Sequence, residues 1–172
     1  MDASQAHLAI CNNKHLIDYC DVVTQSFYVT KNLSCIVEQG CVLTNNEELY
    51  KKLKQLRNHG RGADNYDYEE IGYNSRPSEI AAASLIVKLP FIESWTERRI
   101  EIANKYNELL RPLKEAGKLR SLEVTENNKC SFHLFPIWVK NRDIVRKKLL
   151  EKGIETNIQY PTPLHKTGVY KS

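Results

Sequence analysis

The chain has 172 residues, 41% of them hydrophobic, and its 25 basic and 21 acidic residues leave a net charge of +4. This length fits one ordinary domain or two small lobes, and the near balance of charge argues against nucleic acid or an anionic membrane as a partner. Five cysteines without a C-x-x-C pair favour neither a disulfide framework nor a metal site. Since no apolar run is long enough to span a bilayer, the sequence predicts a cytoplasmic protein.

The first 33 residues predict a strand end, a loop and then a complete strand. Residues 1–10 resemble a strand end and its following loop, with nothing before them to form the strand, so we expect a truncated chain. Residues 21–28 are apolar and β-branched and predict a strand. Ser26 then lies at the strand end and Lys31 on the loop beyond it, where α/β sheets bind ligands. A lysine there is weak evidence alone, because most basic side chains are solvated.

The next part predicts a short strand, a helix and a loop. Residues 41–44 form the strand, and Asn46 caps a helix that has acidic residues in its first turn and closes at His59-Gly60. Residues 61–70 are polar and predict a loop. We assign this helix a structural role.

A nearly continuous apolar helix follows the stretch Gly72–Arg76. Pro77-Ser78-Glu79 starts this helix, with proline in the first turn. A helix that is apolar almost all round is typical of a buried or dimer-facing element. Asn74 precedes the helix, and from the residues alone a helix N-cap accounts for it at least as well as a functional role does.

The last third predicts a long helix and a small α+β lobe. The helix runs from Pro90 to about residue 113, and Gly117 ends the helical region. Its apolar side chains are spaced for one packed face: Trp95, Ile102, Tyr106 and Leu109. The lobe is expected to contain strands at residues 121–124, 132–139 and 154–159, and a helix capped by Asn141 and ending at Leu150 before Gly153.

Four stretches together resemble a known family. They are Asp2-Ala3-Ser4-Gln5-Ala6, Ser26 to Leu33, Ile71 to Arg76, and Tyr160-Pro161-Thr162-Pro163-Leu164-His165. In this order and at these separations they resemble the DegT/DnrJ/EryC1/StrS family of pyridoxal-phosphate (PLP) sugar aminotransferases, over nearly the whole chain. The resemblance implies an α/β fold: residues 1–90 as a partial aspartate-aminotransferase-like (fold type I) large domain, and residues 91–172 as a linking helix and small α+β domain.

The resemblance also implies a role for each matched residue. Lys31 would bind PLP covalently and later carry a proton, with Asp2 at the pyridine nitrogen, Gln5 beside the ring and Ser26 at the phosphate. In the family the asparagine at the position of Asn74 reaches the cofactor phosphate of the neighbouring subunit, and the segment of His165 lies near the active-site mouth. The residue types alone are equally consistent with structural roles. Asp2 can be a frayed terminal residue, Ser26 a strand-end cap and His165 a packing residue.

One departure from the family lies just after the lysine. The family has a glycine-rich segment there, whereas this chain reads Ser34-Cys35-Ile36-Val37-Glu38-Gln39-Gly40 and keeps only Gly40. Side chains at Ser34, Val37 and Gln39 therefore stand where positive φ or a close approach of the backbone is required.

The reaction implied by the resemblance is transfer of an amino group from an amino acid, expected to be glutamate, to a nucleotide-linked ketosugar in polysaccharide or deoxyaminosugar biosynthesis. Relatives with histidine at the lysine position carry out a dehydration, and Lys31 argues against that branch. Family members are about twice as long, so we expect a C-terminal half that is inactive alone. It would act as a homodimer, be completed by a separate N-terminal half, or persist as an inactive dimerisation or interaction module.

Overall fold

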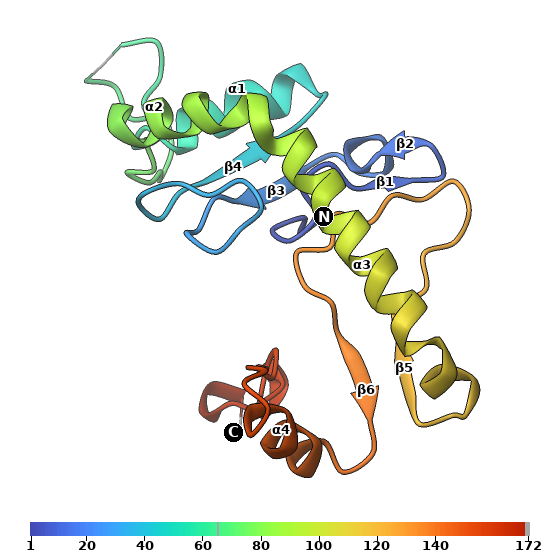
Figure 1. The fold of residues 1–172 in the computed structure, drawn as a ribbon. Coiled ribbons are helices and arrows are strands. Elements are labelled where there is room, and N and C mark those ends of the chain that lie inside the picture. Colours follow the sequence, from blue (N-terminus) through green and yellow to red (C-terminus); the bar gives the residue numbers. More distant parts are fainter. Residues whose placement is uncertain (65, 171–172) are drawn as a thin grey trace. The chain divides into compact units, whose positions relative to one another are not determined.

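The computed structural model describes residues 1–64 and 66–170. The chain divides into two compact units (Figure 1): Met1–Leu110 with Leu122–Phe135, and Arg111–Ser121 with Pro136–Ser172. Helix α3, Ile92–Glu115, begins in the first unit and ends in the second. The predicted boundary between residues 90 and 91 concerns the domains of the family and stays a prediction.

The centre of the first unit is a short sheet. Strand β3, Val23–Ser26, pairs antiparallel with β4, Gly40–Leu43, so that Ser26 lies opposite Gly40. The N-terminal segment runs along the other edge of β3, where the backbone N–H of Ala3 donates to the Thr24 carbonyl at 2.8 Å. The predicted strands are confirmed, although both are shorter or shifted, and Ser26 ends β3 as expected.

A hairpin follows the N-terminal segment. Strands β1, Ile10–Cys11, and β2, Lys14–His15, pair antiparallel and lead into a short 3-10 helix, Leu16–Tyr19. The two turn residues Asn12 and Asn13 have φ of 46° and 60°. Asparagine tolerates this left-handed conformation, which tight hairpin turns require at both central positions.

Helix α1, Glu47–Leu56, begins at the predicted cap. The Asn46 side-chain oxygen accepts hydrogen bonds from the backbone N–H groups of Glu48 and Leu49, at 2.9 and 3.0 Å. His59 and Gly60 follow the helix with φ of 65° and 72°, so the predicted closure of the helix at this pair is confirmed. The cap satisfies N–H groups that have no partner within the helix.

This cap allows a matched comparison of two neighbouring asparagines. We expect Asn46→Ala to lower the free energy of unfolding by about 1 kcal/mol, because two amide hydrogen bonds are lost at the start of α1. Asn45→Ala removes an exposed side chain of the same kind from the preceding position, and it should change stability by less than about 0.5 kcal/mol. Urea denaturation of both variants measures the difference, and equal losses would contradict the assignment.

Helix α2, Glu79–Lys88, begins two residues later than Pro77. Its N-cap is Ser78, whose hydroxyl accepts from the Ala81 backbone N–H at 3.1 Å. The alternative in which Asn74 caps this helix was therefore wrong, and so was the placement of proline in the first turn. Serine and asparagine cap helices by the same chemistry, and only the position where the backbone turns helical separates them.

Much of the apolar surface of α2 faces outward. Ile80, Ile86 and Val87 are 72%, 69% and 69% exposed, whereas Ala81 is fully buried. On β4, Val42 and Leu43 are 45% and 41% exposed. An apolar helix or sheet surface of this kind is typical of a protein contact surface.

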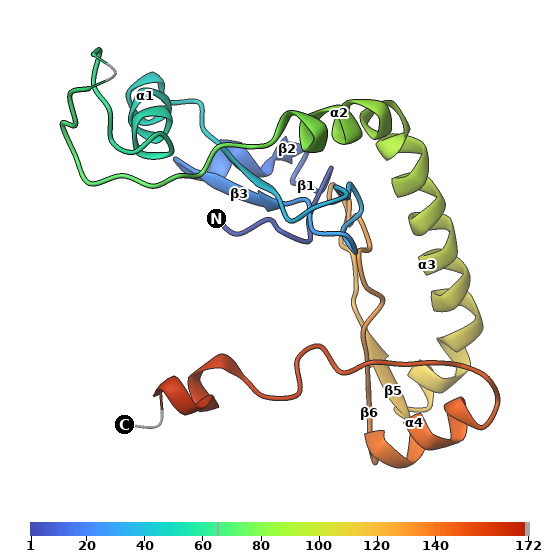
Figure 2. The same ribbon diagram turned by 90° about the vertical axis from the view of Figure 1, so that its left-hand side faces the viewer.

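The 3-10 turn Leu89–Phe91 leads into α3, which Figure 2 shows as the longest helix drawn. Its buried residues are Ile92, Thr96 and Ala103. The predicted packed face was wrong, since its members are 40%, 43%, 49% and 66% exposed: Trp95, Ile102, Tyr106 and Leu109. The helix contacts its unit through a neighbouring stripe, where threonine and alanine allow close approach.

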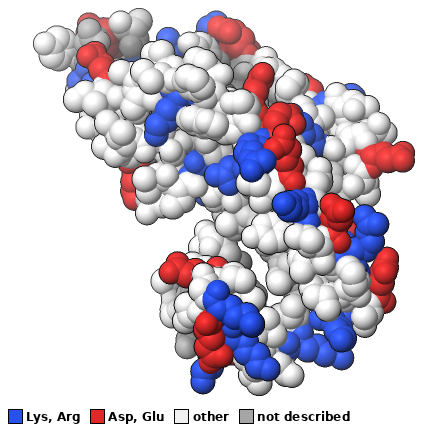
Figure 3. Space-filling view, in the orientation of Figure 1, with Lys and Arg blue, Asp and Glu red and all other residues white. Residues whose placement is uncertain are grey.

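The helices carry no membrane-spanning segment. Among the described residues, no helix combines the length and the apolar composition needed to cross a bilayer. On the face shown in Figure 3, basic and acidic side chains are interspersed.

In the second unit, strand β5, Leu119–Ser121, pairs antiparallel with β6, Ile137–Val139, and helix α4, Arg142–Leu150, follows. Two 3-10 turns, Leu164–Lys166 and Gly168–Tyr170, lie near the end. Asn141 occupies the predicted position before α4, but its side chain makes no cap hydrogen bond. The predicted strand at 121–124 lies instead at 119–121, directly after the α3 turn at Gly117.

Two predicted strands were largely wrong. Of residues 132–139 only 137–139 are a strand, because Phe132 has φ of 42° and the Phe132 carbonyl accepts from the Arg99 side chain at 3.4 Å. No strand is described over residues 154–159, where the Thr156 carbonyl accepts from the Arg146 side chain at 3.2 Å. In both segments, side chains partner carbonyls that a strand would pair with a neighbouring strand.

Candidate active site

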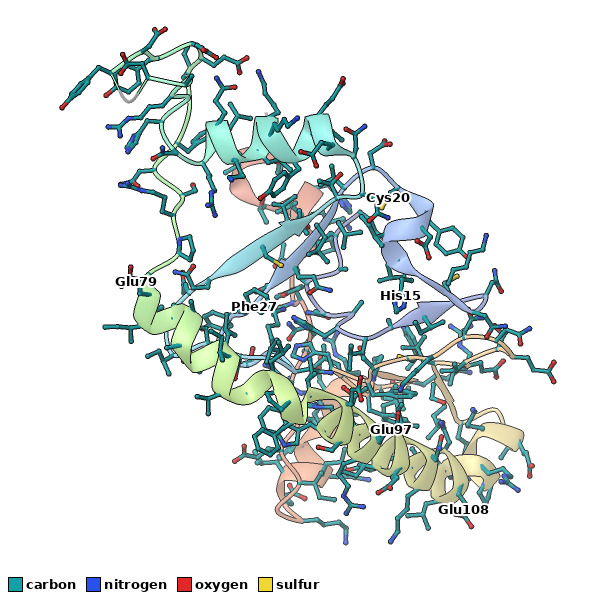
Figure 4. The ribbon with its side chains drawn as sticks, turned by 90° about the horizontal axis from the view of Figure 1, so that it is seen from above. His15, Cys20, Phe27, Glu79, Glu97 and Glu108 are labelled. Carbon is teal, nitrogen blue, oxygen red and sulfur yellow. The ribbon has the colours of Figure 1, made fainter. Side chains whose placement is uncertain are left out.

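The loop after β3 carries Lys31 and is held by its own backbone. The Lys31 N–H donates to the Tyr28 carbonyl at 2.8 Å, and the Cys35 N–H donates to the Phe27 carbonyl at 2.7 Å. Phe27, labelled in Figure 4, directly follows the end of β3. The Ser26 hydroxyl oxygen accepts from the Tyr28 N–H at 3.2 Å. Ser26 therefore caps a backbone group, as a serine at a strand end can, and its hydroxyl hydrogen remains available to donate.

Side chains clamp the same loop from two sides. Asn32, only 6% exposed, donates through its amide nitrogen to the Ser131 carbonyl at 2.9 Å. The ammonium group of Lys88, at the end of α2, donates to the Ser34 carbonyl at 2.7 Å and lies 3.2 Å from the Ser34 hydroxyl. Sequence reasoning did not assign a role to Asn32, Lys88 or Ser131. Ser34, which replaces a family glycine, thus gains a partner on α2.

Asp2 lies at the edge of β3 and is bonded rather than frayed. One carboxylate oxygen accepts from the Ser4 hydroxyl at 2.5 Å and from the Ser4 N–H at 2.9 Å. These hydrogen bonds lower the pKa of the Asp2 carboxyl, and the positive charges of Lys31 and the N-terminus act in the same direction. Asp2 therefore stays ionised at neutral pH, with the Lys31 ammonium close enough to contribute.

Two histidines lie within electrostatic reach of Lys31. His7 is 3% exposed, and its ring lies 5.8 Å from the Phe27 ring. Burial, followed by the charges of His133 and Lys31, lowers the pKa of His7 to about 4. Burial also lowers the pKa of His133, and the charges of Lys31 and Arg99 add to that effect. Both imidazoles are therefore neutral at pH 7.

The other predicted site residues lie elsewhere or make different contacts. Gln5 takes part through its backbone, since its carbonyl accepts from the Ser131 hydroxyl at 3.5 Å. Asn74 pairs with Asn58 after α1, and its side-chain oxygen accepts from two Arg76 nitrogens at 3.2 Å. His165 is exposed in the second unit. The structure thus brings Asp2, Ser26 and Lys31 to one sheet end, and leaves the roles of Asn74 and His165 as predictions.

Comparison with known proteins identifies the family. The model of the DegT/DnrJ/EryC1/StrS aminotransferase family matches residues 1–172, the whole chain. The chain belongs to this family. The resemblance seen in the four motifs is confirmed, and so is the fold it implies. Aminotransferases of the DegT/DnrJ/EryC1/StrS family depend on PLP, and a solved Bacillus subtilis relative contains the bound cofactor PMP.

The family relatives are longer than this chain. It is 37% identical to a pleiotropic regulatory protein of Geobacillus stearothermophilus, over 99% of this chain and 45% of the relative. It is 36% identical to the dTDP-3-amino-3,4,6-trideoxy-alpha-D-glucose transaminase of Streptomyces venezuelae, over 98% of this chain and 44% of the relative. A Brucella abortus family structure is 34% identical, with a TM-score of 0.89, 99% of this chain covered and 44% of that chain. The chain therefore spans less than half the length of these relatives.

Proposed function

We propose that this chain is the lysine-bearing half of a PLP-dependent aminotransferase that moves an amino group from an amino acid, glutamate in our proposal, to a nucleotide-linked ketosugar. The observation that carries the proposal is the grouping of Asp2, Ser26 and Lys31 at one end of β3, with the Lys31 charge acting on the Asp2 carboxylate. Transamination requires an amine, a carboxylate and a phosphate anchor, and these three residues supply one of each.

The residues present fit the cofactor. Asp2 is held ionised by Ser4, which suits a carboxylate that keeps a proton on the pyridine nitrogen. Ser26 has a hydroxyl hydrogen to donate to a phosphate oxygen, and Lys31 is half-buried on a fixed loop. When bound, PLP supplies an electron sink for the carbanion that transamination generates. In this proposal Lys31 carries the migrating proton, Gln5 lies beside the ring, Asn74 acts on the neighbouring subunit and His165 contacts substrate.

The rest of the catalytic unit comes from other chains in this proposal. The chain spans 44% of the Streptomyces venezuelae relative, and that relative acts on a nucleotide-linked sugar by its name. A complementing N-terminal half and a second copy of the pair would cover the apolar side chains exposed on α2 and β4. We place this assembly in the cytoplasm.

Covalent labelling tests the proposal directly. The purified chain is mixed with pyridoxal 5′-phosphate, reduced with borohydride and digested, and the labelled lysine is located by mass spectrometry. We expect the label at Lys31 ahead of the exposed lysines, because this amine lies beside a carboxylate and a phosphate anchor. Labelling spread evenly over the surface lysines would contradict a cofactor site at Lys31.

One alternative has specific support. Ser34, Val37 and Gln39 stand where the family has glycines, and α2 presents an exposed apolar surface. A catalytically inactive remnant that acts as a dimerisation or interaction module accounts for both observations. Such a module would show no preferred labelling of Lys31, and it would still associate with itself or with a partner in sedimentation experiments.

A further inference from the structure

The hydrogen bonds of Asn32 determine which nitrogen of His133 carries the proton. The Ser131 carbonyl can only accept, so the Asn32 group 2.9 Å from it is the amide nitrogen. The Asn32 carbonyl oxygen then faces Nδ1 of His133 at 3.2 Å. That oxygen can only accept, so Nδ1 must donate. In the neutral imidazole the second ring nitrogen, Nε2, is therefore unprotonated.

The unprotonated nitrogen has no partner in residues 1–64 and 66–170, where Nδ1 makes the one hydrogen bond found for this ring. The charged groups whose fields reach the ring are Lys31, from the loop after β3, and Arg99, from α3. The Arg99 side chain donates to the Phe132 carbonyl. Lys31 therefore remains as the donor available to Nε2.

His7 is the other imidazole near Lys31, and it differs from His133 in one respect. In the described part of the chain neither of its buried ring nitrogens has a hydrogen-bond partner, so nothing fixes its tautomer. Asp2, on the neighbouring segment, is already hydrogen-bonded to Ser4. Of the groups around Lys31, His133 alone is both held in place and supplied with a defined acceptor atom.

We infer that His133 is a positioning residue for Lys31, whose amine donates a hydrogen bond to Nε2 of the imidazole. Asn32 then fixes the lysine twice. It anchors the adjacent backbone to Ser131, and it sets the His133 tautomer that receives the amine. The catalytic consequence, an amine held in one direction for attack on an aldehyde, rests on the proposed function. The hydrogen bond itself does not.

Nitrogen NMR of the whole chain without cofactor tests the hydrogen bond. In protein labelled with ¹⁵N-histidine at neutral pH, we expect His133 to show a protonated Nδ1 and an unprotonated Nε2. Asn32→Ala should remove the preference for the Nδ1 proton. Lys31→Met should move the Nε2 resonance downfield, because the nitrogen loses its donor. Lys105→Met, an exposed lysine on α3, is the matched control and should leave the resonance unchanged.

The wild-type spectrum alone can overturn the inference, so the result does not depend on a variant that folds. A proton on Nε2, or an Nε2 resonance that Lys31→Met leaves in place, would exclude the hydrogen bond. Labelling by pyridoxal 5′-phosphate separates this failure from failure of the proposed function. If Lys31 is labelled but the NMR signature is missing, the inference is wrong. If the signature is present but Lys31 is not labelled, the contact stands and the proposed function fails.

A kinetic arm addresses positioning. We expect His133→Phe, which keeps a ring but has no acceptor, to slow the labelling of Lys31 by about tenfold or more, because the amine is no longer held in one direction. His133→Gln offers a side-chain carbonyl as an acceptor and should recover part of the rate. Equal rates in the wild type and both variants would overturn the positioning role.

Discussion

Amination of a nucleotide-linked ketosugar should fall by at least about a thousandfold when Lys31 is replaced by alanine, since the reaction loses its nucleophile and its proton carrier together. The assay combines this chain with the part of the Streptomyces venezuelae relative that precedes the matched region, and supplies PLP, glutamate and the ketosugar. The aminated product is then quantified by mass spectrometry.

The comparison needs a lysine that lies outside the candidate site. Lys105→Ala removes an exposed lysine from α3 and should retain the activity of the mixture. Activity that survives in Lys31→Ala would show that another amine forms the bond to the cofactor. A mixture that is inactive even with the wild-type chain would favour the inactive interaction module over a split enzyme.

A second large effect should appear in the pH dependence of stability. The pKa of His7 falls to about 4 in the folded chain, against about 6.5 for an unperturbed histidine. The unfolded chain therefore binds the extra proton more readily between these values. The stability that the neutral His7 contributes is complete above pH 6.5 and is lost as the pH falls towards 4, by up to about 3 kcal/mol.

His7→Phe isolates this contribution because it keeps a ring beside Phe27 and removes the titration. Between pH 7 and pH 4, the free energy of unfolding measured in urea should fall by about 3 kcal/mol less in His7→Phe than in the wild type. At pH 7 the variant should be at least as stable, since two buried ring nitrogens without partners are removed. His15→Phe, at an exposed position, is the control. Parallel curves for the wild type and His7→Phe would refute the assignment.

The local parts of this fold were predictable from the sequence. Asn46 and the acidic residues after it define the start of α1 through contacts two and three residues apart. The β-branched residues before Ser26 define β3, and Lys31 follows on a loop as expected. Strand prediction failed at 132–136 because tertiary contacts decide it. Arg99 partners the Phe132 carbonyl from 33 residues away, and no local pattern reports such a contact.

The candidate site was predictable in its residue types but not in its supports. Motif spacing selected Asp2, Ser26 and Lys31, which meet at one sheet end. Asn32 contacts Ser131 across 99 positions, and Lys88 contacts Ser34 across 54. In the sequence, Asn32 is one polar residue after a lysine and Lys88 is one cation at a helix end. Their function depends on a fold that brings distant segments together.

The bond from Lys88 to Ser34 links the surface of the molecule to its chemistry. One side of α2 is an exposed apolar surface that includes Ile86 and Val87, and the next residue holds the loop that bears Lys31. A subunit that docks on α2 and shifts this helix would therefore pull directly on the reactive amine. Assembly and catalytic competence would then be coupled mechanically, so that the lysine reaches its working position only when the neighbour is in place.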